Sequence, residues 1–147
     1  MITGAKTLDI QATPDEVFAR LADLPAYPTW QSFVTDVGIR DQDAAGRATV
    51  VEARLDAKAT TLRAVLRYAF EPTSRVSWTY EDGDLKDMRG SFTLTPAGED
   101  GSVTSVTMEV SVDPGFKLGL LLRGPVEARV KAAVLDGTLE GLARTFA

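Results

Sequence analysis

The sequence contains no histidine and no cysteine among its 147 residues. Imidazole and thiolate are the principal protein ligands of zinc, copper and haem, so we expect no metal site and no cofactor of these kinds. The Ser-His-Asp and Cys-His catalytic arrangements are excluded for the same reason. Acid–base catalysis near neutral pH would then require a carboxyl group or a tyrosine with a shifted pKa, which is harder to arrange. Enzymatic activity is therefore disfavoured, although it is not excluded.

Long apolar segments and basic clusters are also missing. The longest apolar run, LGLLL at Leu118–Leu122, is far shorter than the ~20 residues that a membrane helix needs. The first residues, MITGAKTLDIQATP, include no apolar segment typical of a secretory signal, and the chain has no cysteine for disulfides, so a cytoplasmic location is expected. The net charge is −5 without a basic block, so nucleic acid is not an expected partner.

The remaining composition is that of an ordinary globular protein, with 44% hydrophobic and 25% charged residues. A chain of this length predicts a single domain, residues 1–147, with room for a core. A first strand is predicted at Lys6–Gln11, where Leu8 and Ile10 share one face. A helix at Pro14–Ala22 follows, because Thr13 and Glu16 form a capping box and Pro14 suits the first helical position.

The segment after this helix, LADLPAYPTW, contains two prolines three residues apart. Pro25 and Pro28 each lack an amide hydrogen and restrict the preceding residue, so they break the helix. We expect a sharp turn and a second short helix, with Tyr27 and Trp30 plugging one end of the sheet. Trp30 is interpreted as a structural plug in preference to a ligand contact.

Six further segments alternate between apolar and polar residues, which predicts strands with one buried face. Short, turn-rich connections between them indicate hairpins and hence an antiparallel meander. The predicted strands are VTDVGIRD from Val34, RATVVEARLD from Arg47, TLRAVLRYAF from Thr61, RVSWTY from Arg75, MRGSFTLT from Met88 and SVTSVTMEVSV from Ser102.

A long amphipathic helix is predicted from Pro125 to Phe146, the only element long enough to cover the apolar sheet face. Ala133, Gly137 and Gly141 follow one another at four-residue spacing along it. Glycine costs about 1 kcal/mol relative to alanine within a helix, so this line requires an explanation. Two explanations remain open. The small residues keep an internal space free for a ligand, or they permit close contact with a neighbouring backbone.

Aromatic and methionine side chains of the strands face the same interior. A mainly apolar chamber with a few hydroxyl groups is typical of a small-molecule site. The candidate ligand-binding residues are Tyr68, Trp78, Tyr80, Met88, Phe92, Met108, Ala133, Gly137 and Gly141. No catalytic residue is assigned, because alternation places Arg63, Arg67 and Arg89 on the solvent side.

The motifs ATPDEVFARLADLPAYPTW and RGSFTLTP, with the long helix after a strand-ending proline, resemble the START-like (SRPBCC) superfamily. Within it, the polyketide cyclase/dehydrase and coenzyme-Q-binding group is the most similar. The resemblance implies an α+β helix-grip fold, in which a seven-stranded antiparallel sheet wraps around the long C-terminal helix and encloses a hydrophobic tunnel. It covers the whole chain and is less specific for function, because one fold carries many functions.

The favoured function is binding of a lipophilic small molecule such as a lipid, a quinone or a polyketide. A polyketide cyclase or aromatase and a protein-interaction module are the alternatives. Leu118–Leu122 is either the first part of the long helix or an apolar lid that touches a membrane transiently, without stable insertion. A monomer or a homodimer is expected.

Overall fold

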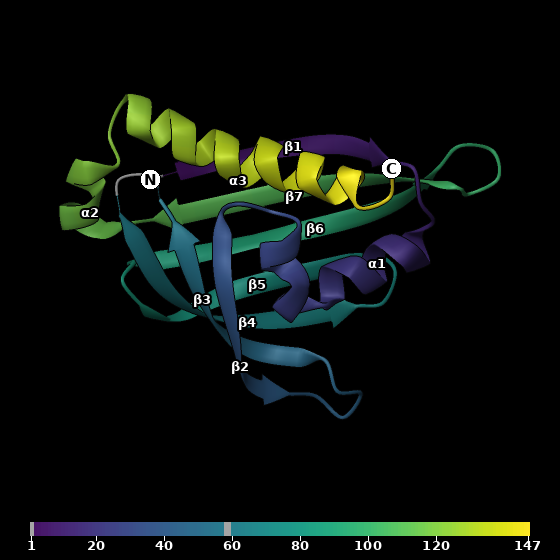
Figure 1. Ribbon diagram of the computed structural model, residues 1–147, viewed down its shortest axis with the longest axis horizontal. Helices are drawn as coiled ribbons and strands as arrows, with labels where there is room; N and C mark the ends of the chain where they lie inside the picture. The colour runs from purple at the N-terminus through teal and green to yellow at the C-terminus, as the bar shows by residue number, and fades with distance from the viewer. Residues whose placement is uncertain (1, 58–59) are drawn as a thin grey trace.

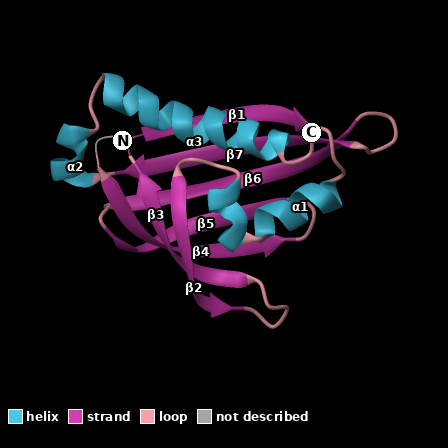
Figure 2. Cartoon of the chain, viewed as in Figure 1, coloured by secondary structure: helices cyan, strands magenta, loops and turns pink. Residues whose placement is uncertain are grey.

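The computed structural model describes residues 2–57 and 60–147 and shows an antiparallel sheet with helices on one side (Figures 1 and 2). The sheet has seven strands in the order β1-β7-β6-β5-β4-β3-β2. This α+β architecture confirms the fold predicted from the sequence. Its elements are β1 (Ile2–Ile10), α1 (Pro14–Ala22), the 3-10 helix η1 (Leu24–Thr29), β2 (Val34–Gln42), β3 (Ala48–Asp56), β4 (Thr61–Glu71), β5 (Arg75–Gly83), β6 (Asp87–Ala97), β7 (Val103–Asp113), α2 (Gly115–Leu121) and α3 (Pro125–Arg144).

Strands β2 to β7 form the predicted meander, and β1 pairs with β7 to complete the sheet from its other side. Most apolar residues of the strands face the helices and are buried, whereas Val50 and Val65 lie on the opposite face, paired with Arg67 and Glu52. Ile39 is an exception at 45% exposed. Ile39 pairs with the buried Val51 and so lies on the same face of the sheet, but β2 is the edge strand and has no neighbour on its outer side.

Helix α1 begins as predicted. The Thr13 hydroxyl accepts a hydrogen bond from the Glu16 amide at 3.3 Å, and the Glu16 carboxylate accepts one from the Thr13 amide at 3.1 Å. The proline segment then forms η1, which is a 3-10 helix containing Pro28. The Tyr27 hydroxyl donates to the Leu21 carbonyl at 2.6 Å and so fixes η1 against the end of α1.

Helix α3 crosses the sheet over β1 and β7 (Figure 1). Lys6 on β1 donates to Asp136 on α3 at 2.6 Å, which ties the helix to the sheet edge. The apolar segment before α3 forms the separate helix α2, and Gly124, at a φ of 57°, lies between the two helices. In the described part of the chain no helix has the length and apolar character required to span a membrane.

Candidate functional site

An apolar cavity of about 30 Å³ lies between the sheet and α3. It brings together five of the nine candidate residues, namely Tyr68 on β4, Trp78 on β5, Met88 and Phe92 on β6, and Met108 on β7. These side chains come from four neighbouring strands, because alternation directs every second residue to the helical side. The sequence pattern therefore located the sheet wall of this cavity.

The opposite wall was not identified from the sequence. The segment from η1 to the start of β2 contributes Tyr27, Gln31, Phe33 and Val34. Helix α3 contributes Val134 and Thr138. Leu55 and Leu66 complete the lining. Gln31 and Phe33 lie between predicted elements, where periodicity gives no facing direction. Only the packing of the η1–β2 connection under α3 places them in the cavity.

The indole of Trp78 dominates the sheet wall. Its ring centroid lies 5.3 Å from that of Phe92 and 5.8 Å from that of Tyr68. It covers Gly90 on β6, because a Cβ atom at Gly90 would lie only 2.3 Å from Trp78 Cζ2. The absence of a side chain at Gly90 therefore allows the indole to lie over the adjacent strand.

The polar groups of the cavity wall are few. Trp78 is 5% exposed, and its Nε1 is buried without a hydrogen-bond partner. The Thr138 hydroxyl donates to Gln31 Oε1 at 3.2 Å. Burial raises the pKa of the Tyr68 hydroxyl, which keeps this group protonated at neutral pH. Among the described residues that line the cavity, Trp78 Nε1 is thus the buried side-chain donor without a partner, within a mainly apolar surface.

The line of small residues on α3, Ala133, Gly137 and Gly141, does not line this cavity. The residues of α3 that face the cavity are Val134 and Thr138. Val134 follows Ala133 and Thr138 follows Gly137, so the face toward the cavity is rotated by about 100° around the helix from the small residues. A Cβ atom at Gly137 would have open space around it, with the Ala132 carbonyl oxygen 3.9 Å away. At Gly141 it would lie 2.1 Å from the Trp30 carbonyl oxygen, so this glycine permits a close backbone contact.

The ninth candidate, Tyr80, connects backbone segments. Its hydroxyl donates to the Leu85 carbonyl at 2.9 Å and accepts from the Leu85 amide at 3.1 Å. These two bonds hold the turn between β5 and β6, which accounts for a polar side chain at this position. The alternation of β5 predicted which face of the sheet Tyr80 lies on, but it did not predict that the Tyr80 hydroxyl would form hydrogen bonds with the backbone of the turn.

A second internal cavity of about 20 Å³ adjoins the first. Both cavities are lined by Phe33, Leu55, Met88 and Val134, which form the partition between them. The second cavity extends toward α2, where Leu122 contributes to its wall. The unbranched Met88 side chain has three rotatable side-chain bonds and is the most adaptable member of the partition.

The arginines that alternation placed on the solvent side are found there, in ion pairs. Arg63 pairs with Glu52 at 2.8 Å and with Asp82 at 3.2 Å. Hydrogen bonds from Arg40 and Arg63 lower the pKa of Glu52. Arg67 pairs with Glu81. These charges hold the outer face of the curled strands together and lie away from the internal cavities.

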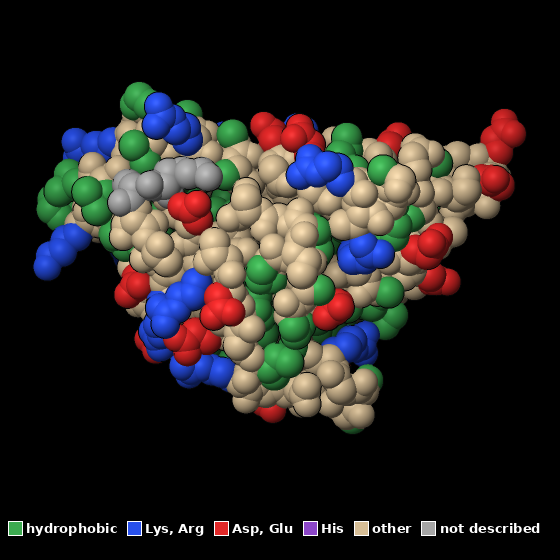
Figure 3. Space-filling view, in the orientation of Figure 1, with side chains coloured by type: hydrophobic (Ala, Val, Ile, Leu, Met, Phe, Trp, Pro, Cys, Tyr) green, Lys and Arg blue, Asp and Glu red, His purple; other side chains and the backbone are tan. Residues whose placement is uncertain are grey.

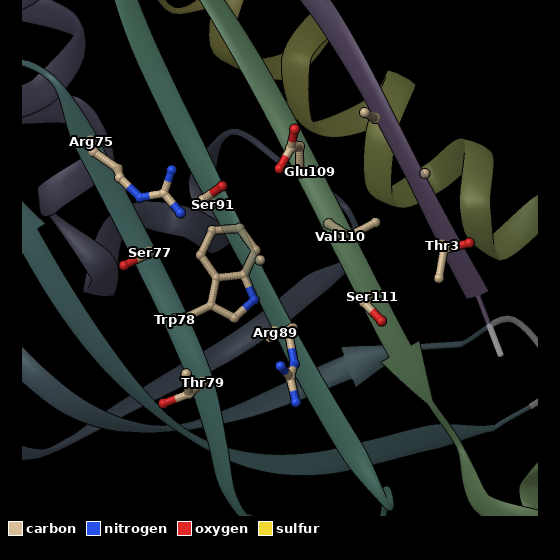
Figure 4. Close-up of a pocket in the computed structure, with 13 residues that line it drawn as sticks. Thr3, Arg75, Ser77, Trp78, Thr79, Arg89, Ser91, Glu109, Val110 and Ser111 are labelled. Atoms are coloured by element: carbon tan, nitrogen blue, oxygen red, sulfur yellow. The ribbon is translucent and has the colours of Figure 1, made fainter.

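A groove of about 530 Å³ on the outer face crosses β1, β7, β6 and β5 (Figure 4). Arg75 and Arg89 extend over it beside small hydroxyl residues, with Glu109 among them. Both arginines already have acidic neighbours, at 3.7 Å between Arg75 and Glu71 and at 2.9 Å between Arg89 and Asp87. This groove is therefore open to solvent and lacks the enclosure typical of a small-molecule site.

Comparison with known proteins agrees with this geometry. The sequence matches the family described as "Polyketide cyclase / dehydrase and lipid transport" over residues 1–147. The chain belongs to this family. No curated protein matches the sequence.

Solved structures similar to this polyketide cyclase/dehydrase family member share its fold at low sequence identity. A START superfamily protein from Mycobacterium smegmatis is 15% identical with a TM-score of 0.83, over 98% of this chain and 96% of that one. A protein from Thermus thermophilus is 19% identical with a TM-score of 0.81, over 97% and 94%. The Zhui aromatase/cyclase from Streptomyces sp. R1128 is 19% identical with a TM-score of 0.73, over 99% and 95%.

Proposed function

We propose that the chain binds a small, predominantly apolar molecule with a hydrogen-bond acceptor, such as a lipid, a quinone or a polyketide, between the sheet and α3. The observation that carries this proposal is the Trp78 indole N–H, which is buried in the cavity wall without a partner. A buried donor left unpaired costs about 1–3 kcal/mol. A ligand carbonyl or hydroxyl oxygen would remove that cost on binding, while the surrounding apolar side chains would contact the rest of the ligand.

The size of the cavity determines how binding must occur. A volume of about 30 Å³ admits one or two water molecules and no lipophilic ligand. Binding therefore requires the side chains between the two cavities to move, and Met88 is the member of the partition that can do so with little backbone change. The joined space extends from Trp78 to Leu122 below α2.

Two further observations support binding of such a molecule. The family description includes lipid transport, and an aromatase/cyclase is among the structural neighbours. The lining is apolar apart from the Trp78 N–H, the tyrosine and threonine hydroxyls and the Gln31 amide. Burial of apolar ligand surface contributes about 25 cal/mol per Å², so an apolar lining of this kind favours a lipophilic compound.

Polyketide cyclisation is the alternative that the Zhui aromatase/cyclase suggests. Proton abstraction would require a base, but the described residues that line the cavity include no carboxylate. Tyr68 does not supply a base near neutral pH, because burial raises the pKa of its hydroxyl and keeps the group protonated. We therefore favour binding without catalysis.

Two tryptophan variants provide the test. Trp78→Phe keeps an aromatic ring and removes the N–H. Trp30→Phe is the matched control, because Trp30 Nε1 is also buried without a partner but lies outside the cavity lining. Native mass spectrometry of protein from a cell extract should show a bound apolar compound. Titration with a fatty acid and with a quinone should then give about five- to tenfold weaker binding for Trp78→Phe and unchanged binding for Trp30→Phe.

Two results would contradict the proposal. The first is the absence of any bound compound together with no response to the added fatty acid or quinone. The second is equal affinity in the two variants, which would remove Trp78 from the site. Turnover of a poly-keto substrate by the purified protein would instead support the cyclase alternative.

A further inference from the structure

Helix α2 presents two apolar faces. Leu118 and Leu122, four residues apart, turn toward the core, and Leu122 is buried. Phe116 is 83% exposed, Leu120 49% and Leu121 53%. Apart from Ile39, these three are the large apolar residues exposed among the described residues, so the exposed apolar surface is concentrated on one short helix. Concentration of this kind marks an interaction surface.

The charge around α2 is opposite in sign to that of the whole chain. Residues 115–131 contain four basic residues, Lys117, Arg123, Arg129 and Lys131, and one acidic residue, Glu127, for a net charge of +3. The whole chain carries −5, so the remaining residues carry −8. Figure 3 shows basic and hydrophobic side chains together at the α2 end of the molecule.

These cations are available to an external partner. Among the described residues, Lys117 and Arg123 form no salt bridge and are exposed. Lys86, which lies near the start of α2, is different because its Nζ is 4.0 Å from the Asp113 carboxylate. Lys117 and Arg123 therefore flank the exposed apolar residues with uncompensated positive charge.

We propose that α2 docks this protein on the surface of a bilayer containing anionic phospholipid. Phe116, Leu120 and Leu121 insert among the acyl chains near the interface, while Lys117 and Arg123 contact the phosphate groups. Apolar insertion supplies most of the affinity, and basic residues near an anionic leaflet add electrostatic attraction. The negative charge on the rest of the chain opposes other orientations, so α2 faces the membrane.

The docked orientation also relates to the interior. Leu122, at the end of α2, and Val130, in the second turn of α3, line the internal cavity closest to this end. Docking therefore brings the bilayer next to that cavity. Docking itself does not require an interior ligand, so the surface and the cavity can be tested separately.

Vesicle sedimentation tests the surface. Wild-type protein should sediment with phosphatidylcholine vesicles that contain phosphatidylserine, less with pure phosphatidylcholine, and less again as salt is raised. The double variant F116S/L121S should lose about tenfold or more of the partition coefficient, because it removes two apolar anchors. The double variant K117E/R123E should lose the dependence on phosphatidylserine.

The matched control is Ile39→Ser, which removes another exposed apolar residue, 45% exposed, on the distant strand β2. It should sediment like the wild type. Wild-type protein that stays in solution with phosphatidylserine vesicles would overturn the proposal, as would equal sedimentation of F116S/L121S and I39S. Circular dichroism checks that each variant is folded.

Separate readouts distinguish this proposal from the interior ligand. F116S/L121S should bind a fatty acid or quinone in the absence of vesicles as the wild type does, while Trp78→Phe should sediment with vesicles normally. Loss of self-association in F116S/L121S, without any vesicle binding by the wild type, would instead assign the surface to a second copy of this chain.

Discussion

Gly141 and Gly137 lie one turn apart on α3, and an added methyl group should have opposite effects at the two positions. At Gly141 the new Cβ would lie 2.1 Å from the Trp30 carbonyl oxygen and 3.2 Å from the Trp30 carbonyl carbon. Both contacts involve backbone, so no side-chain rotation relieves them. The end of α3 must move away from the segment after η1, which carries the buried Trp30.

The magnitude follows from two opposing effects. Overpacking costs about 1–3 kcal/mol, and a backbone clash this short belongs at the upper end. Alanine recovers about 1 kcal/mol of helix propensity, which leaves a net loss of ~2 kcal/mol for Gly141→Ala. Unfolding entropy of about 2.1 cal/mol/K per residue over 147 residues converts this to a fall in Tm of ~6 °C.

Gly137→Ala is the internal comparison. Its Cβ would meet only the Ala132 carbonyl oxygen, at 3.9 Å, so the propensity gain is unopposed. We expect a rise in stability of about 1 kcal/mol, or ~3 °C in Tm. Thermal and urea unfolding of both variants provide the assay. A Gly141→Ala protein as stable as the wild type would refute the close contact between α3 and the Trp30 carbonyl.

Three other substitutions test the remaining contacts. Gly90→Ala would place Cβ 2.3 Å from Trp78 Cζ2, so it should displace the indole, shift the tryptophan fluorescence and destabilise the protein by about 2 kcal/mol; unchanged fluorescence would contradict the packing. Tyr80→Phe should cost about 1–2 kcal/mol in urea unfolding, because both hydrogen bonds to Leu85 are lost, whereas an unaffected midpoint would count against them. Glu52→Gln should destabilise at neutral pH. Because the folded state lowers the pKa of Glu52, the ionised carboxylate stabilises the protein above pH 4.5, the ordinary pKa of this group. This stabilisation is lost as the pH falls through the lowered pKa, so the stabilities of wild type and variant should converge in acid.

Local signals in the sequence were sufficient for most of the elements and for the meander, whereas the seven-stranded helix-grip fold was implied by the family resemblance. Alternation of period two defined the strands and their inner faces, and short turn-rich connections required neighbouring strands to pair. Thr13, Pro14 and Glu16 determined where α1 begins, and Pro25 and Pro28 determined that it could not continue. These are interactions between residues close in sequence, so they can be predicted without the tertiary structure.

The candidate site was predictable only in part, because some of its residues are brought together by contacts between residues far apart in the sequence. Alternation identified Trp78 and the other residues of the sheet wall, because strand geometry fixes the side to which they point. The rotation of α3 about its axis is decided by contacts far apart in sequence, including the carbonyl of Trp30 against Gly141 and the ion pair between Lys6 and Asp136.

That rotation brings Val134 and Thr138 to the cavity in place of Gly137. The small size of the cavity likewise depends on how side chains from several separate segments fill one space. The sequence by itself therefore determined the sheet, its faces and the presence of a covering helix. Only tertiary packing decided which helix face lines the interior, how much space remains there, and that α2 is separate from α3 and leaves Phe116, Leu120 and Leu121 exposed.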